Sequence, residues 1–199
     1  MRPHGRAAVV SALTRIAQPL VAHGVAAPDA TRVRPGRLDL RFLRHYRPLL
    51  SDLLTLERVK VPLTSRSKDE VLRELVQLAM PEADVTARDR TVTAVLDREA
   101  LLSTGIGLGI AIPHGRTSDV ETIILTAGLA IDGIDFDALD GRPVTLFFLL
   151  LGPAQAAGAH VRALGRISRI LRHESVRDAL NVAASAEEFL ELLVGAEVS

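Results

Sequence analysis

The chain has 199 residues, 48 % of them hydrophobic, and no net charge, so it can form one domain with a substantial core. Electroneutrality and a shortage of aromatic residues (five Phe, one Tyr, no Trp) argue against a dedicated nucleic-acid-binding protein. The absence of cysteine excludes disulfides, thiolate catalysis and cysteine-based zinc sites, and it fits the cytoplasmic location that we expect.

Residues 1–47 differ in composition from the rest of the chain. They contain nine arginines, no lysine and two aspartates, a net charge of +7, so the remainder carries −7. They also include the turn-prone stretch VAAPDATRVRPGR. We therefore predict a poorly ordered, basic extension over residues 1–47 without an activity of its own, and a folded domain over residues 48–199.

Helical and strand patterns alternate from residue 48 onward. After a short helix at LSDLL, strands are expected at 58–63, 108–113, 122–130 and 144–151. Helices are expected at 67–80, where Ser67 and Glu70 form a capping-box pattern, and at 89–102, 156–171, 174–183 and 186–194. The apolar run VTLFFLLLG is too short to span a membrane and indicates a strand that is buried on both faces. These elements predict an α/β fold with a mixed β-sheet between helical layers.

The most distinctive segment is STGIGLGIAIPHGR, residues 103–116. It lacks the Gly-Lys-Ser/Thr ending of a Walker loop. It is preceded by a helix and followed by Pro113, which is the wrong order for a dinucleotide-binding turn. We expect Pro113 to stiffen the backbone before His114, and Gly115 to let the chain turn after it. His114 would then stand at the carboxyl end of a strand, where α/β sheets bind ligands.

Two interpretations of His114 remain open on this pattern. Leu108, Ile110, Ile112 and His114 alternate onto one face of the expected strand, so His114 could be a packed core histidine. Two other residues favour an anionic site. Arg98 lies next to the apolar stripe of its helix. A guanidinium in that position requires an anionic partner, which can be either a structural carboxylate or a phosphate. His160 lies near the start of the 156–171 helix, a position that attracts anions and favours a neutral imidazole.

The sequence LDREALLSTGIGLGIAIPHGR, residues 96–116, resembles the signature of phosphotransferase-system EIIA domains of the fructose/mannitol type, which include nitrogen-regulatory EIIA proteins. The resemblance runs from about residue 48 to the C-terminus. It implies that His114 is the phosphorylatable histidine, that Arg98 is the arginine of the family's Arg-Glu pair, and that His160 is its second active-site histidine. Leu108 departs from the family pattern, in which this position is polar and often asparagine.

The resemblance implies a phosphotransferase that acts as a carrier. It would accept a phosphoryl group from an HPr-like phosphocarrier protein and pass it to an EIIB partner, or hold it as a regulatory signal. The alternative is a non-catalytic binding module whose partners, such as a transporter or kinase, sense the state of His114. Backbone N–H groups near Thr104, and the hydroxyls of Thr104 and Ser103, are further candidate phosphate donors. We expect no cofactor and no metal, and a zinc site from His114, His160 and His173 is disfavoured.

Overall fold

The computed structural model describes residues 49–198, and the predicted extension over residues 1–47 lies outside them. Every element described below belongs to the unit that spans residues 47–199. Its helices are α3 (Leu50–Leu53), η1 (Leu56–Arg58), α4 (Lys68–Ala79), α5 (Val85–Leu101), α6 (Ala157–Leu171), α7 (Glu174–Asn181) and α8 (Ala186–Val198). Its strands are β1 (Val59–Lys60), β2 (Gly105–Gly107), β3 (Ile110–Ala111), β4 (His114–Arg116), β5 (Ile124–Ile134) and β6 (Val144–Gly152).

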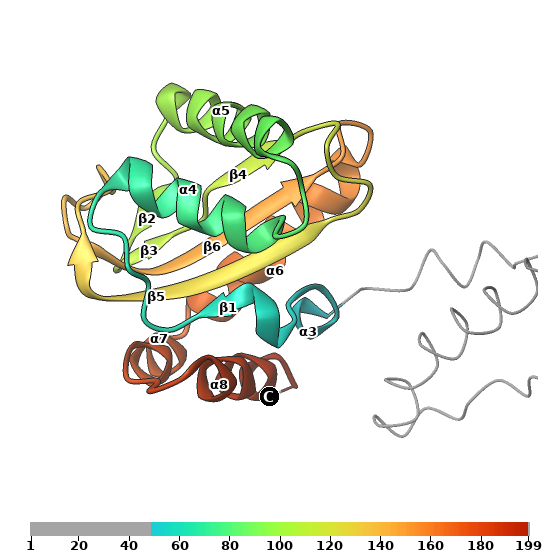
Figure 1. Cartoon of the computed structure of the whole chain (residues 1–199). Helices are drawn as coiled ribbons and strands as arrows, with labels where there is room; N and C mark the ends of the chain where they lie inside the picture. Colours follow the sequence, from blue (N-terminus) through green and yellow to red (C-terminus); the bar gives the residue numbers. More distant parts are fainter. Residues whose placement is uncertain (1–48, 199) are drawn as a thin grey trace, which may run out of the picture. The chain divides into compact units, whose positions relative to one another are not determined.

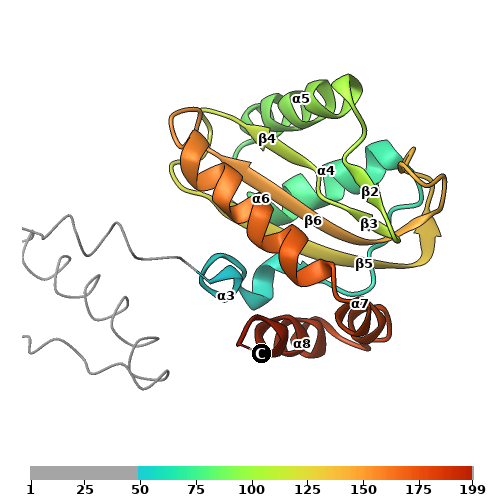
Figure 2. The same cartoon turned by 180° about the vertical axis from the view of Figure 1, so that it is seen from behind.

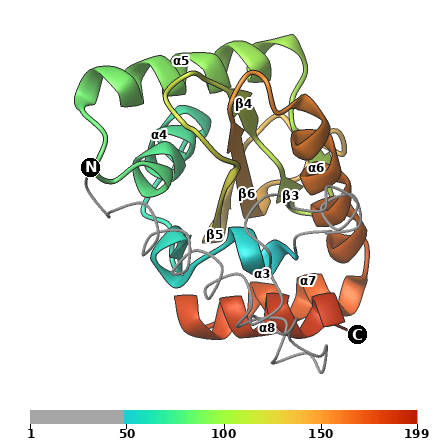
Figure 3. The same ribbon diagram turned by 90° about the vertical axis from the view of Figure 1, so that its right-hand side faces the viewer.

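The strands form one mixed sheet in the order β1-β5-β6-β3-β2, with β4 also paired to β6. β5 and β6 are antiparallel, whereas β1 lies parallel to β5, and β3 and β4 lie parallel to β6. Helices α4 and α5 cover one face of the sheet (Figure 1) and α6 covers the other (Figure 2). Figure 3 shows these layers edge-on. The predicted α/β fold with a mixed sheet between helical layers is confirmed.

The central strand β6 has no exposed face. Phe147, Leu149 and Leu151 join the core under α4 and α5, and the alternating residues Leu146, Phe148 and Leu150 join the core under α6, α7 and α8. This confirms the prediction that the run VTLFFLLLG is a strand buried on both sides. Within residues 49–198, every helix is too short or too polar to cross a membrane.

The starts of α4, α5 and α8 follow from their N-caps. The Ser67 hydroxyl accepts a hydrogen bond from the Glu70 N–H at the start of α4, and the Ser185 hydroxyl does the same for Glu188 at the start of α8. The prediction for α5 began four residues late, because it overlooked Asp84, whose carboxylate accepts from the Ala87 N–H. β5 also extends to Ile134, beyond residue 130 where the predicted strand ends.

The single strand predicted at 108–113 is wrong. Residues 107–109 form a tight turn, in which Leu108 has a φ of 58° and the flanking glycines have φ of 87° and 74°. The strand then runs along β6 in two pieces, β3 and β4, interrupted at Pro113, which has no N–H to donate. His114 is therefore the first residue of β4, instead of standing at the carboxyl end of a strand, and Leu108 is exposed instead of sharing its face.

The turn predicts a stabilising substitution at Leu108. A left-handed backbone is costly for leucine and tolerated by asparagine, and the exposed Leu108 side chain contributes little burial. Leu108→Asn should raise the free energy of unfolding by about 1 kcal/mol, measured by urea denaturation. The matched control is Ile106→Asn, an exposed position in β2, which should give no gain. Equal effects at the two positions would contradict the strain at Leu108.

Candidate functional site

His114 lies between α5 and α6, at the point where the interrupted strand resumes after Pro113. Its first pairing partner in β6 is Leu150, whose N–H donates to the carbonyl of Pro113 (3.0 Å). Gly115 is needed next to it, because a Cβ there would lie 2.9 Å from the Val95 side chain of α5. The Pro-His-Gly sequence thus brings the strand close under α5 with the His114 side chain half-buried.

The two ring nitrogens of His114 have different partners. Nδ1 lies 2.9 Å from the carbonyl oxygen of Ile112. Because a carbonyl only accepts hydrogen bonds, Nδ1 must carry the proton. Nε2 then keeps its lone pair, which accepts a hydrogen bond from Nε–H of Arg98 at 3.1 Å. The unprotonated nitrogen, the one that can act as a nucleophile, is therefore Nε2.

The pKa of His114 lies below its ordinary value. Burial is the main cause, since it disfavours the charged ring, and the positive charge of Arg98 acts in the same direction. The hydrogen bond to Ile112 and the negative charge of Glu99 oppose the shift. The net effect keeps the imidazole neutral at pH 7, the form required for attack by Nε2.

Arg98 is held from two sides. Besides the bond to His114, its Nη1 donates to the carbonyl of Leu102, 3.0 Å away at the end of α5. Sequence reasoning left open a structural carboxylate as its partner. Within residues 49–198, Arg98 forms no ion pair with a carboxylate, so its charge is available to an incoming anion.

His160 lies beside His114 on the first turn of α6. The two ring centroids are 5.6 Å apart, and His160 is only 5 % exposed. Neither of its ring nitrogens has a hydrogen-bond partner among residues 49–198. Burial, followed by the nearby His114 and Arg116, lowers the pKa of His160 to about 4. Gly152 leaves room for the ring, since a Cβ there would lie 3.1 Å from Nδ1.

Ser103 and Thr104, the further phosphate donors expected from the sequence, use their hydroxyls elsewhere. The Ser103 hydroxyl donates to the carbonyl of Phe136, and the Thr104 hydroxyl donates to the carboxylate of Glu99. The backbone N–H of Thr104 also donates to Glu99. A role for these two residues in phosphate binding stays a prediction.

The structure thus brings together His114, Arg98 and His160 from three separate elements. Sequence reasoning assigned no role to Glu99, the glutamate of the Arg-Glu pair, because a charged residue on a helix is usually solvated, whereas this one is 5 % exposed. Across residues 49–198, no group of His, Asp and Glu side chains is arranged to ligate a metal ion. The chemistry available is that of a neutral imidazole nucleophile beside one cation and one buried neutral ring.

The described domain is similar in sequence to known proteins. Residues 52–195 match the family model "Phosphoenolpyruvate-dependent sugar phosphotransferase system, EIIA 2". A nitrogen regulatory protein of Pseudomonas aeruginosa is 40 % identical over 149 residues, which cover 73 % of this chain and 94 % of that protein. The fructose-specific EIIABC component of Bacillus subtilis is 34 % identical over 144 residues, 72 % of this chain but only 23 % of that much longer protein.

A solved structure shows the same fold. The crystal structure of nitrogen regulatory protein IIA-Ntr from Neisseria meningitidis superposes with a TM-score of 0.67 at 32 % sequence identity. The match covers 72 % of this chain and 98 % of that one. Family model, relatives and fold agree, and the chain belongs to the EIIA 2 family of the phosphoenolpyruvate-dependent sugar phosphotransferase system.

Proposed function

We propose that the protein is a histidine phosphoryl carrier that accepts a phosphoryl group on Nε2 of His114 from an HPr-like phosphocarrier protein. The observation that carries the proposal is the hydrogen bond from Nδ1–H to the Ile112 carbonyl, which leaves the Nε2 lone pair facing Arg98. Family membership supplies the reaction class. Both histidines and Arg98 lie within the matched residues 52–195, so we assign the activity to the domain spanning residues 48–199.

In the transfer step, the Nε2 lone pair forms a bond to phosphorus while the phosphorus–nitrogen bond of the donor phosphohistidine breaks. The electron pair of that bond returns to the donor nitrogen. Nδ1 of His114 keeps its proton throughout and continues to donate to Ile112. No proton therefore has to leave His114, and the site needs no general base.

Arg98 has to change partners during this step. In the unmodified protein its Nε–H occupies the lone pair that must attack. As phosphorus approaches Nε2, the guanidinium releases the ring and donates to phosphoryl oxygens, where negative charge is spread over three equatorial atoms. His160, neutral because its pKa is about 4, carries one N–H that can contact another of these oxygens.

The fate of the phosphoryl group separates two roles. The relatives include a fructose-specific EIIABC component and a nitrogen regulatory protein, so transfer to an EIIB partner and use as a regulatory signal both fit the family. In the second role, the protein is a binding module, and its protein partners respond to whether His114 is phosphorylated. Incubating the phosphorylated protein with EIIB proteins and measuring loss of label distinguishes the two.

The proposed function predicts that His114 is the residue that becomes phosphorylated. With enzyme I, HPr and radiolabelled phosphoenolpyruvate, the full chain should acquire an acid-labile, base-stable phosphoryl group, and His114→Ala should remove it. The control is His173→Ala at the exposed N-cap of α7, which should be labelled normally. Normal labelling of His114→Ala would refute the assignment.

The proposed function also makes a prediction about Arg98. Arg98→Gln should slow phosphoryl transfer by on the order of 10²–10³, the effect of losing one preorganised donor. Its free energy of unfolding should change by less than about 1 kcal/mol, because no buried carboxylate loses a partner. Arg98→Lys should restore only part of the rate, since an ammonium lacks the planar fork.

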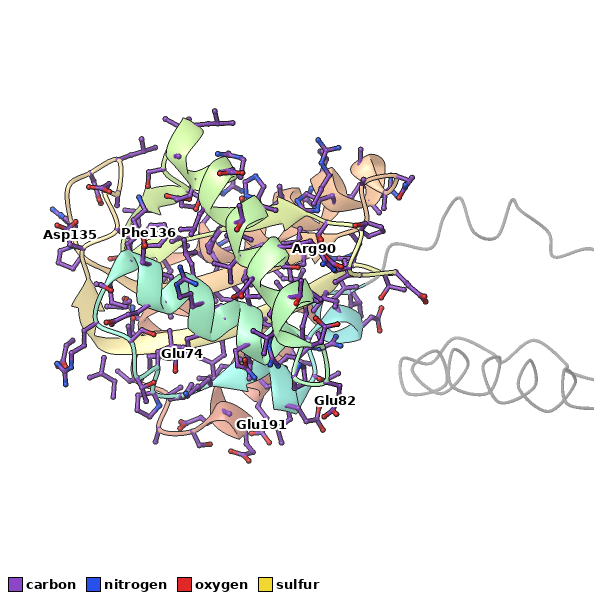
Figure 4. The ribbon with its side chains drawn as sticks, turned by 45° about the horizontal axis from the view of Figure 1, so that its top comes forward. Glu74, Glu82, Arg90, Asp135, Phe136 and Glu191 are labelled. Carbon is purple, nitrogen blue, oxygen red and sulfur yellow. The ribbon has the colours of Figure 1, made fainter. Side chains whose placement is uncertain are left out.

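The matched control is Arg90→Gln on the same helix, labelled in Figure 4. Arg90 pairs with Asp119 on the protein surface, so its loss should leave the transfer rate unchanged. Stopped-flow or quench-flow transfer rates and urea unfolding are measured on the same samples. A large loss of stability in Arg98→Gln with a normal rate per folded molecule would show that Arg98 is structural.

A further inference from the structure

Glu99 is a buried carboxylate that the transfer step described above does not use. It follows Arg98 on α5 but is only 5 % exposed. Its two oxygens accept hydrogen bonds from the backbone N–H of Thr104, both at 3.0 Å, and one accepts from the Thr104 hydroxyl at 2.5 Å. Nζ of Lys68, at the start of α4, completes the set at 3.0 Å. Glu99 thus ties the end of α5 to the segment that follows it.

That segment contacts Arg98 directly and is linked to His114 through Ile112. The carbonyl of Leu102, two residues before Thr104, accepts from Nη1 of Arg98. The carbonyl of Thr104 accepts from the N–H of Ile112 (3.0 Å), and the carbonyl of Ile112 orients the ring of His114. Residues 102–104 therefore set the position of the arginine on one side and of the histidine on the other.

Lys68 balances the charge of Glu99 and links it to the loop after β5. Its ammonium also pairs with Asp137 and lies 4.7 Å from the ring centroid of Phe136. The Phe136 carbonyl in turn accepts from the Ser103 hydroxyl. Figure 4 labels Phe136 beside the start of α4. The segment 102–104 is consequently held from α4, α5 and the 135–143 loop together.

We propose that Glu99 is a positioning residue that fixes segment 102–104, and through it the guanidinium of Arg98 and the ring of His114, in the geometry for phosphoryl transfer. The proposal rests on the function proposed above. A carboxylate suits this task, since it accepts the Thr104 N–H and hydroxyl together and pairs with Lys68. Small displacements at such a site cost large factors in rate, because the reacting atoms must be within about 3–3.5 Å.

The test is Glu99→Gln in the full chain. The amide keeps the shape but loses the ion pair with Lys68 and one of the two acceptor oxygens. The transfer rate per folded molecule should fall about tenfold, less than for loss of Arg98 itself. In an Arg98→Gln background the same change should cost less than in the wild type, because only the ring of His114 is then left to position.

Glu74→Gln is a closely matched control. Glu74 on α4, labelled in Figure 4, also accepts from the N–H and hydroxyl of a threonine, Thr64, and pairs with Lys60. Arg98 and His114 have other hydrogen-bond partners. Its replacement should lower stability and leave the rate per folded molecule unchanged. Thr104→Val and Thr104→Ser provide a second pair for the case that Glu99→Gln folds poorly. Valine should slow transfer and also expose the Arg98 Nε–H to solvent exchange in the unmodified protein, and serine should restore both, whereas loss of a phosphate contact alone would change only the rate.

Nitrogen-15 NMR of the unmodified protein supplies a readout that does not depend on transfer. The Arg98 Nε–H signal should be protected from solvent exchange in the wild type and in Glu74→Gln, and lose that protection in Glu99→Gln. A Glu99→Gln variant with normal rate and a protected Arg98 signal would overturn the positioning role. A wild-type protein that takes no label on His114 would instead refute the proposed function, while the NMR comparison still tests the placement of Arg98.

Discussion

The hydrogen bond from Nδ1–H of His114 to the Ile112 carbonyl (2.9 Å) is the contact on which the candidate site depends. It fixes the tautomer, and therefore decides which nitrogen has a lone pair and in which direction that lone pair points. The acceptor lies only two residues before His114, across Pro113. The orientation of the His114 ring is consequently set by a residue close in the sequence. The rest of the fold holds this short segment in place and shields it from solvent.

Strand β6 provides that support. It pairs with β3 and β4 on either side of Pro113, so the interruption does not detach the chain from the sheet. It also presents apolar side chains to both helical layers. The resulting burial lowers the pKa of both histidines and leaves them neutral at pH 7. One neutral ring can then attack phosphorus while the other can donate a hydrogen bond.

Much of this architecture could be predicted from the sequence, because helix caps and the apolar run of β6 are local signals. The grouping of His114, Arg98 and His160 was expected from the family resemblance, since periodicity alone left the packed-histidine interpretation open. The turn at Leu108 could not be predicted from alternation, because leucine rarely adopts a positive φ. The role proposed for Glu99 depends on its contacts with Thr104 and Lys68, which only the folded chain brings together.

The most direct test of this account is the ionisation and tautomer of His114 in the unmodified protein, followed by nitrogen-15 NMR as the pH is varied. We predict a neutral ring at pH 7 with the proton on Nδ1, and a pKa below the ordinary value for histidine. The pKa should rise in Arg98→Gln, since the guanidinium charge that opposes protonation is then removed. A ring with its proton on Nε2, or one that is largely protonated at pH 7, would contradict the account.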